Sequence, residues 1–382
     1  MRWQAALSAA LVAMGLSAIA LWPAGARANV ATCPVFPVDN VWNTRVDNLP
    51  LDARSAAYIN SIGPSTGLHP DFGAGTWDGG PIGIPYTTVP GTQPPVPVTF
   101  DYAGESDPGP YPIPTDAPIE GGANSTGDRH VLVVDRDRCK LYEMWNSWPN
   151  ADGSWHAGSG AVFDLNSNAL RPATWTSADA AGLPILPGLA RYDEVNAGAI
   201  HHALRFTAAA TQNKFIWPAR HYASSNTDPN VPPMGQRVRL KASFDISRYS
   251  AQTQVILTAL KRYGMFLADN GSNWYISGVP DPGWNDDALV NELRTVTGAS
   301  FEAVDESSLM VDANSGQAGG VPPTTTPTAT QTQTRTSTAT RTRTPTRTNT
   351  PMPTNTPGPT PTPTATATPT WNFWLWLPLV WR

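Results

Sequence analysis

The composition of the C-terminal part of the chain limits which residues can belong to a globular fold. Residues 321–370 consist mostly of Thr and Pro, with some Ala and four Arg. Such a composition cannot bury enough apolar surface to offset the entropy lost on ordering. We therefore expect residues 317–370 to form a disordered, extended stalk, and any globular fold to be confined to the residues before it.

The last twelve residues, 371–382, are aromatic and apolar. A membrane-spanning helix needs about 20 apolar residues, and Pro378 interrupts this shorter run. The segment is typical of a short hydrophobic anchor or sorting tail after a stalk. A merely adhesive tail is the alternative.

Residues 1–28 have the pattern of a signal peptide. Arg2 precedes an uncharged apolar stretch over 5–22, and Ala26 and Ala28 form a small-x-small cleavage site. An uncleaved anchoring helix is the alternative, which Pro23 and Gly25 disfavour. We expect a secreted, extracellular protein that begins at Asn29 and stays associated with the cell surface.

The core between these segments is acidic. The signal and tail hold seven of the 25 Lys and Arg and none of the 30 Asp and Glu, so residues 29–316 carry a formal charge of −12. This argues against nucleic acid and anionic lipid as partners and leaves membrane contact to the C-terminal tail. The whole chain has few charged residues and 15 Trp, which is typical of secreted β-rich proteins that handle sugars, such as extracellular polysaccharide or cell-wall glycan.

The chain has two cysteines, Cys33 and Cys139, both in the core. In an oxidising compartment we expect them to form a disulfide bond. Two free thiols are the alternative.

Short apolar runs separated by Gly, Pro and Asn predict a mostly-β core over 29–316. We expect one domain of β-sandwich or jelly-roll type, with a few short helices near its C-terminal end. The pattern predicts a hairpin around residues 135–137, a helix over 251–263 after Ser250, and a second helix that begins at Asn285. Asn270 followed by Gly271 predicts a hairpin that joins strands at 265–268 and 274–276.

Histidine is scarce, with six in the chain, so each one is informative. His202 lies in a predicted strand over 199–207, where alternation puts it on the apolar face and Arg205 on the other. It is a candidate acid, base or ligand at the edge of a groove. A core histidine with satisfied hydrogen bonds is the alternative.

Arg220, His221 and Tyr222 follow one another after a predicted strand over 214–217. A guanidinium, an imidazole and a phenol together suit a carboxylated sugar, because Arg neutralises the acid while His or Tyr moves the proton. A polar surface loop is the alternative. Some histidines could meet around a metal, but their spacing has no metal signature, and we expect no cofactor.

Carboxylates form a second set of candidates, because glycoside hydrolysis needs one carboxyl group as acid and another ionised. Asp193 and Glu194 precede the His202 strand and are candidate acid–base partners. Asp179 and Asp269 are candidates whose alternatives are turn or cap residues. Asp71 and Asp128 lie close in sequence to histidines. The candidate substrate-binding side chains are Trp175, Trp217, Arg205, His130 and Asp269.

Several short motifs resemble those of a family of secreted bacterial proteins. They are GLPILPGL at 182–189, AIHHALRF at 199–206, WPARH at 217–221, RLKA at 239–242, ALKRYGM at 259–265 and ADNG at 268–271. The resemblance covers nearly the whole core. It implies a single exported domain and carries over no activity and no catalytic residue.

These patterns predict an enzyme that acts on extracellular polysaccharide, either a glycoside hydrolase or a polysaccharide lyase. His202, His221, Arg220 and Tyr222 are the expected catalytic residues, with Asp193 or Glu194. A non-catalytic module that binds carbohydrate or the cell wall, or an adhesion protein, is the alternative. The pattern leaves the substrate, a bound metal and the oligomeric state open.

Overall fold

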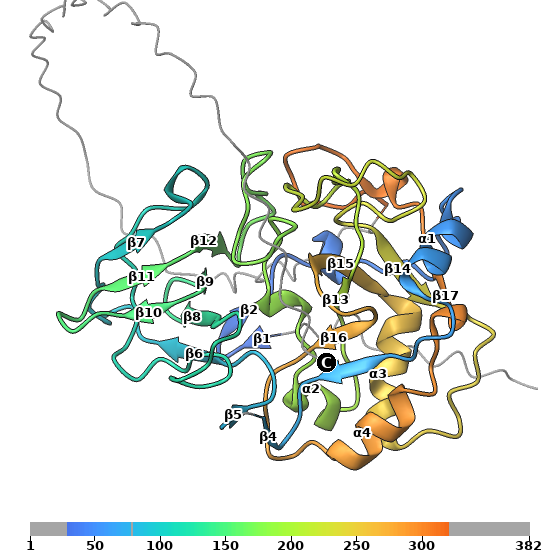
Figure 1. Cartoon of the computed structure of the whole chain (residues 1–382), viewed down its shortest axis with the longest axis horizontal. Helices are drawn as coiled ribbons and strands as arrows, with labels where there is room; N and C mark the ends of the chain where they lie inside the picture. Colours follow the sequence, from blue (N-terminus) through green and yellow to red (C-terminus); the bar gives the residue numbers. More distant parts are fainter. Residues whose placement is uncertain (1–28, 78, 321–382) are drawn as a thin grey trace, which may run out of the picture. The chain divides into compact units, whose positions relative to one another are not determined.

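The computed structural model describes residues 29–77 and 79–320. The predicted signal peptide over 1–28, the stalk from residue 321 onward and the hydrophobic tail over 371–382 lie outside the described residues. A six-stranded mixed sheet organises the fold, with the strand order β17-β14-β15-β13-β16-β3 (Figure 1). Its strands are β3 (His69–Asp71), β13 (Leu204–Ala208), β14 (Arg237–Leu240), β15 (Met265–Asn270), β16 (Tyr275–Ser277) and β17 (Phe301–Ala303). The parallel pairs are β13 with β15 and β16 with β3.

A second mixed sheet has the order β12-β9-β8-β6, and a three-stranded sheet has the order β10-β11-β7. Their strands are β6 (Tyr86–Val89), β7 (Val98–Phe100), β8 (Val131–Asp135), β9 (Lys140–Trp145), β10 (Trp148–Pro149), β11 (Trp155–Ala157) and β12 (Ser159–Asp164). Two small hairpins complete the strands: β1 (Asn29–Val30) with β2 (Cys33–Pro34), and β4 (Thr76–Trp77) with β5 (Gly80–Pro81).

The helices are short and pack around the six-stranded sheet. They are α1 (Ser55–Ile62), α2 (Tyr192–Asn196), α3 (Ala251–Arg262) and α4 (Asp286–Leu293). Helix α3 packs against β14, and α4 packs against both α3 and β3. In the part of the chain that the structure describes, none of the helices has the length and apolar character required to cross a bilayer.

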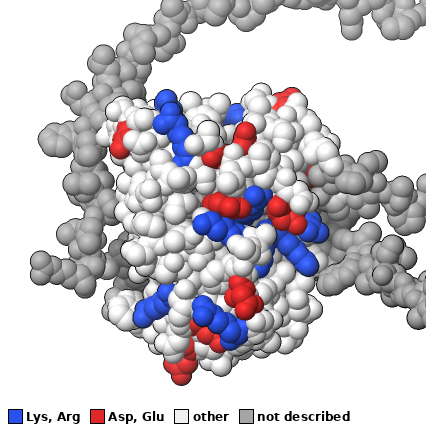
Figure 2. All heavy atoms as spheres, turned by 90° about the vertical axis from the view of Figure 1, so that its right-hand side faces the viewer, with Lys and Arg blue, Asp and Glu red and all other residues white. Residues whose placement is uncertain are grey.

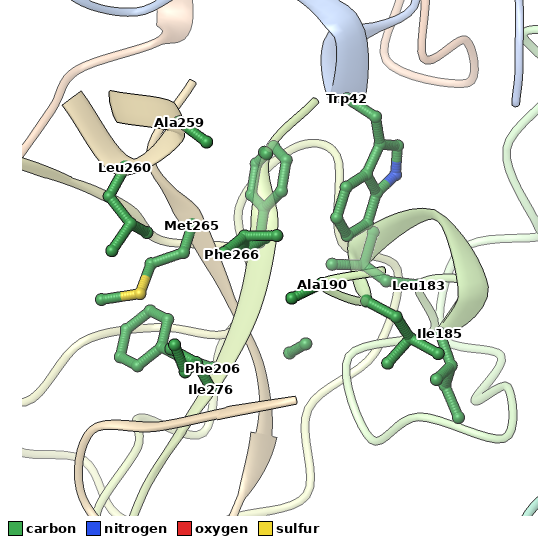
Figure 3. Close-up of a cluster of buried hydrophobic side chains, with 14 of the residues drawn as sticks. Trp42, Leu183, Ile185, Ala190, Phe206, Ala259, Leu260, Met265, Phe266 and Ile276 are labelled. Carbon is green, nitrogen blue, oxygen red and sulfur yellow. The ribbon is translucent and has the colours of Figure 1, made fainter. Parts of the chain in front are cut away.

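Apolar side chains cover both faces of the six-stranded sheet (Figure 3). Met265 and Phe206 lie toward Leu260 of α3, whereas Phe266 lies on the opposite side with Trp42, Leu183 and Ile185. Alternation along β13 therefore puts Phe206 on the α3 face and Arg205 on the opposite face, which the segment over residues 177–190 covers. Gly188 allows this close packing, because a Cβ there would lie 2.9 Å from the Cβ of Arg205 and from the Trp42 ring.

The prediction of a mostly-β domain with a few short helices is confirmed, but its sandwich or jelly-roll part is not. Both large sheets contain parallel pairs, whereas sandwiches and jelly rolls are antiparallel. The predicted helices at 251 and 286 and the hairpin of β8 and β9 are present. Asn285 caps α4 by accepting a hydrogen bond from the Ala288 backbone amide at 3.0 Å.

Three sequence predictions about strands are wrong. The predicted strand over 214–217 is a loop in which Phe215 forms only an isolated bridge with Met234. The predicted hairpin at Asn270 does not form, because β13 lies between β15 and β16 and pairs with both. The predicted strand over 199–207 begins only at Leu204, so alternation does not apply to His202. In the Asn270 case the long-range pairing of β15 and β16 with β13 decides the local structure, and a local turn signal does not contain that information.

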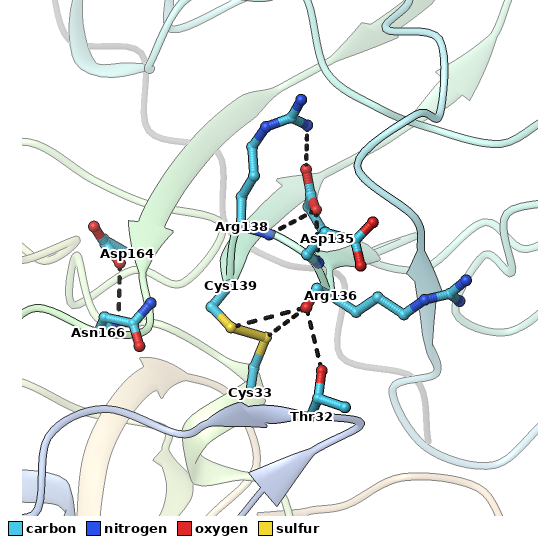
Figure 4. The surroundings of a disulfide bond; sticks show 9 residues. Thr32, Cys33, Asp135, Arg136, Arg138, Cys139, Asp164 and Asn166 are labelled. Atoms are coloured by element: carbon cyan, nitrogen blue, oxygen red, sulfur yellow. Dashed lines mark hydrogen bonds and ion pairs between the residues drawn. A yellow bond between two sulfur atoms is a disulfide. The ribbon is translucent and has the colours of Figure 1, made fainter. Parts of the chain in front are cut away.

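The predicted disulfide between Cys33 and Cys139 is confirmed (Figure 4). It links the start of the described chain to the turn between β8 and β9. Beside it, the hydroxyl of Thr32 donates a hydrogen bond to the backbone carbonyl of Arg136 at 3.3 Å. The bond closes a loop with a sequence separation of 106 residues and so restricts the unfolded chain strongly.

Replacing both cysteines, Cys33→Ser and Cys139→Ser, should lower the free energy of unfolding by about 4–5 kcal/mol, because the loop is long. Guanidinium unfolding monitored by Trp fluorescence measures this. A reducing agent should lower the stability of the wild type to a similar extent and leave the double variant unchanged. Equal stability of variant and wild type would contradict the prediction.

Candidate functional site

Charged side chains gather on the face of the six-stranded sheet opposite α3. We call this group the carboxylate cluster. It comprises the acids Asp71, Glu120, Asp128, Asp179 and Asp269 and the cations His130 and Arg205, which interact electrostatically. The cluster brings together β3, β13, β15 and the loops that precede β8 and α2.

Arg205 is the centre of the cluster and is 4% exposed. Its Nε and Nη2 donate to the two carboxylate oxygens of Asp179 at 3.0 and 2.8 Å, and its Nη1 donates to the Ser277 hydroxyl at 2.5 Å. Asp179 has no exposed side-chain surface. Burial acts to lower the pKa of Arg205, but the Asp179 carboxylate outweighs it and raises that pKa, so this is a fully charged, bidentate pair.

A β-bulge brings Asp269 to the same face. Arg205 pairs with Phe266 across β13 and β15, and regular alternation would put Asp269 on the α3 face. The register shifts after Phe206, so that Thr207 pairs with Asp269. The bulge turns the Asp269 carboxylate toward Arg205, with 4.0 Å between Oδ2 and Nη2. Burial, and then the charge of Asp179, raise the pKa of Asp269 well above its usual value.

Asp71 lies on the same face two strands away. It pairs with Ser277 in the parallel ladder of β3 and β16, and Ser277 in turn contacts Arg205. The side chain is accessible to water, yet desolvation by the surrounding protein and the charge of Glu120 raise its pKa to about 6. A reachable carboxyl group with a pKa close to neutrality is suited to proton transfer.

Glu120 and His130 form a dyad beside these acids. Nδ1 of His130 lies 2.6 Å from a Glu120 oxygen, and Nε2 lies 3.0 Å from the Ala178 carbonyl oxygen. Both ring nitrogens face acceptors, so both carry protons. Burial acts to lower the pKa of His130, but the Glu120 carboxylate prevails and raises it to about 9. In return, the His130 charge overcomes burial and lowers the pKa of Glu120.

Glu143 of β9 fastens the second sheet to the segment that covers Arg205. Its carboxylate accepts backbone hydrogen bonds from Ile185 at 2.9 Å and Leu186 at 2.8 Å. The side chain is fully buried, and desolvation raises its pKa to about 7 against the effect of these donors. This contact and the one between His130 and Ala178 hold the cluster between the two sheets.

The structure places the first group of expected catalytic residues away from the cluster. His202 is 0% exposed and bonds to Glu194 at 3.0 Å and to the Ala203 carbonyl oxygen at 2.8 Å. Glu194 also pairs with buried Arg191 at 2.7 Å, and exposed Asp193 lies 3.7 Å from Arg191. His202 therefore has the environment of a core histidine with satisfied hydrogen bonds, out of reach of a substrate.

Arg220, His221 and Tyr222 diverge in the structure. Arg220 is buried and donates to the carbonyl oxygens of Arg171 and Ala313, so its guanidinium holds loops together. Nδ1 of His221 bonds to the carbonyl of Ala180 at 2.8 Å, beside the loop that carries Asp179. Tyr222 is exposed and stacks on His221. Of the three side chains, His221 and Tyr222 are accessible to solvent, whereas Arg220 is not.

Of the expected substrate-binding residues, Arg205, His130 and Asp269 come together in the cluster. Trp217 instead donates from Nε1 to the Ser315 carbonyl oxygen at 2.8 Å and packs against the core. Trp175 is half-buried, with its ring 5.7 Å from the Arg171 guanidinium carbon.

Sequence reasoning missed Glu120 and the shared location of Asp71, Asp128 and Asp179. The proximity of Asp71 and Asp128 to histidines in the sequence was the available signal. This proximity indicated the histidines as much as the acids. No local sequence pattern showed that these separate segments lie close together in the fold.

The other surfaces and cavities of the described residues provide weaker candidates for a functional site. A cavity of about 20 Å³ beside Trp42, Phe163 and Leu183 has room for about one water molecule. On the face shown in Figure 2, acidic and basic side chains form small mixed groups, and most of the surface is formed by other residues. Within residues 29–77 and 79–320, no group of three or more His, Cys, Asp or Glu side chains is arranged to hold a metal.

Comparison with known proteins adds no relative. No protein-family model, no curated protein and no solved structure matches this chain. The functional argument therefore depends on the geometry and electrostatics of the cluster.

Replacing Arg205 with Met should destabilise the protein by about 3–5 kcal/mol, because Asp179 would stay buried without its partner. The double variant Asp179→Leu, Arg205→Met should recover most of this loss, since no unpaired charge remains. Guanidinium unfolding of both variants and the wild type measures the difference. If R205M alone costs less than about 1 kcal/mol, the pair does not have the burial described here.

The pKa of His130 predicts a pH-dependent stability. Because it is raised from 6.5 to about 9, its stabilising contribution is full below pH 6.5 and is lost as pH rises through 9. The wild type should therefore lose up to about 3 kcal/mol over this range relative to His130→Gln. Urea unfolding of both proteins at several pH values measures this loss. Subtracting the stability of the variant from that of the wild type removes the contributions of the other titrating groups. Parallel curves would contradict the assignment.

Proposed function

We propose that this chain is a hydrolase of extracellular polysaccharide and that the carboxylate cluster is its active site. The observation that carries the proposal is the pair of carboxyl groups with raised pKa, Asp71 and Asp269, on one sheet face beside Arg205. Glycoside hydrolysis needs two carboxyl groups whose environments set them to different protonation states near neutral pH.

Asp269 is the proposed general acid, because burial raises its pKa well above the usual value and so favours its protonated form. It donates its proton to the glycosidic oxygen as the bond from that oxygen to the anomeric carbon breaks. Asp71 is the proposed base, since it is ionised above pH 6 and accessible. It takes a proton from water as the water oxygen bonds to the anomeric carbon. One product gains H and the other OH, which balances the addition of water.

Arg205 lies beside the acid in this proposal. Its bidentate bond to Asp179 fixes the guanidinium, with Nη2 4.0 Å from Oδ2 of Asp269, and leaves it unavailable to a substrate carboxylate. Arg220 is likewise occupied by backbone carbonyl oxygens. Elimination from a uronic acid requires neutralisation of the sugar carboxylate. The occupied guanidinium groups therefore favour hydrolysis over a lyase reaction.

The surface location is part of the same proposal. The signal-like residues 1–28, the Thr- and Pro-rich stretch before 371 and the hydrophobic final segment support an exported protein tethered at the cell surface. The disulfide between Cys33 and Cys139 suits an oxidising compartment. We propose cell-wall or environmental glycan as the partner there.

Asp71→Asn and Asp269→Asn should each lower the turnover rate by about 10²–10⁴-fold, because each removes a proton-transfer group. Product release from a polysaccharide panel, read by mass spectrometry, measures this. Products should be heavier by one water. Asp193→Asn, which changes an exposed acid outside the cluster, is the matched control and should leave the rate unchanged.

The wild-type rate should rise as pH increases through about 6, as Asp71 ionises, and fall at higher pH as Asp269 loses its proton. A pH profile of kcat/KM measures both limbs. Unsaturated products would show that the protein is a lyase and not a hydrolase. Binding of a polysaccharide without release of any product would show that the protein is a carbohydrate-binding module and not an enzyme.

A further inference from the structure

Trp77 is the most exposed large apolar side chain in the described part of the protein, at 79%. It lies in the β4–β5 hairpin and pairs with Gly80. A Trp side chain can bury 150–250 Å² of surface, so leaving its ring in water forgoes a substantial hydrophobic stabilisation. Trp42 and Trp274, by contrast, are 2% and 0% exposed.

The hairpin that carries Trp77 is fixed at both ends. At its root, Gly73 and Gly75 exchange backbone hydrogen bonds with Ile82 at 3.2 Å, and the Ala74 amide donates to Asp286 of α4 at 2.7 Å. In β5, Gly80 abuts the chain at Gly121, where a Cβ on Gly80 would lie 2.0 Å from the Gly121 carbonyl oxygen. The exposed ring therefore stands on an anchored support.

The β4–β5 hairpin is connected to the carboxylate cluster in two ways. Trp77 follows Asp71 by six residues in the chain, and Gly121, which contacts Gly80 of the hairpin, is bonded directly to Glu120. The steps from Trp77 to Gly80, to Gly121 and to Glu120 are each about 4–5 Å between Cα atoms, so Trp77 lies within about 15 Å of Glu120. The hairpin therefore lies near the Glu120 side of the cluster and outside it.

We propose that Trp77 is a stacking platform for a neutral sugar residue of the same polysaccharide chain that the carboxylate cluster cleaves. This inference rests on the proposed function. The face of an indole ring carries partial negative charge and attracts the weakly positive C–H groups on the flat side of a pyranose. An exposed ring beside acid and base groups would hold the chain while the neighbouring bond reacts.

The charges of the cluster select a neutral sugar. Five carboxyl groups lie there against two cations, and both cations are committed, Arg205 to Asp179 and His130 to Glu120. The core as a whole has 18 Lys and Arg against 30 Asp and Glu. A uronate-rich chain would meet repulsion on approach, whereas a neutral glycan would not.

The test measures binding separately from cleavage, using the full chain with Asp269→Asn to prevent turnover. The probes are soluble xylan, mixed-linkage β-glucan, galactomannan and arabinan, with polygalacturonate as the anionic comparison. Affinity electrophoresis should detect binding of D269N to at least one neutral glycan and not to polygalacturonate. Adding Trp77→Ala should weaken that binding at least about tenfold, or ~1.4 kcal/mol, whereas Trp77→Phe should retain most of it.

Met310→Ala in the same D269N background is the matched control, because Met310 is also exposed and lies in a different part of the fold. It should leave the affinity unchanged. Acrylamide quenching gives an independent readout. The difference between the wild type and Trp77→Phe isolates the signal of Trp77, and the neutral glycan should protect that signal.

Unchanged binding by the Trp77→Ala protein, preferential binding to polygalacturonate, or binding to none of the neutral glycans each overturns the inference. Failure of the proposed function looks different. In that case the wild type releases no product, yet binding to a neutral glycan still depends on Trp77, and the platform belongs to a binding module.

Discussion

The bidentate pair of Arg205 and Asp179 is the interaction on which the site depends. Both side chains are almost completely buried, so each charge would be costly without the other. The pair joins β13, in the middle of the six-stranded sheet, to the segment over 177–190, which contains Asp179. Because Glu143 and His130 bond to that same segment, the pair also determines where the second sheet lies.

The two acids Asp269 and Asp71, which lie on the same sheet face as this buried pair, differ in pKa because their surroundings differ. Asp269 approaches Arg205 only because the bulge in β15 turns it to that face, and there desolvation and the Asp179 charge raise its pKa well above the usual value. Asp71, at the other end of the row, is accessible to water and has a pKa of about 6. Two carboxyl groups of one residue type thus acquire different proton affinities from their surroundings, as acid–base catalysis requires.

Sequence patterns predicted local features well and long-range ones poorly. Periodicity located the helix at 251, Asn285 predicted the cap of α4, and the turn at 135–137 predicted the hairpin of β8 and β9. The hairpin signal at Asn270 failed because β13 inserts between the two strands it seemed to connect. Alternation gave His202 a groove-facing position, yet the strand begins two residues later, and the ring is a core group bonded to Glu194.

By itself, the sequence determined the mostly-β character of the core, the pairing of its two cysteines and the acidic composition. These follow from local periodicity, from the number of cysteines and from residue counts. Only the tertiary structure decided which acids meet, since Asp71, Glu120, Asp179 and Asp269 lie on four separate segments. Their proximity arises from strand order, from a one-residue bulge and from a buried ion pair. Each of these depends on contacts between residues far apart in the chain, which no local pattern encodes.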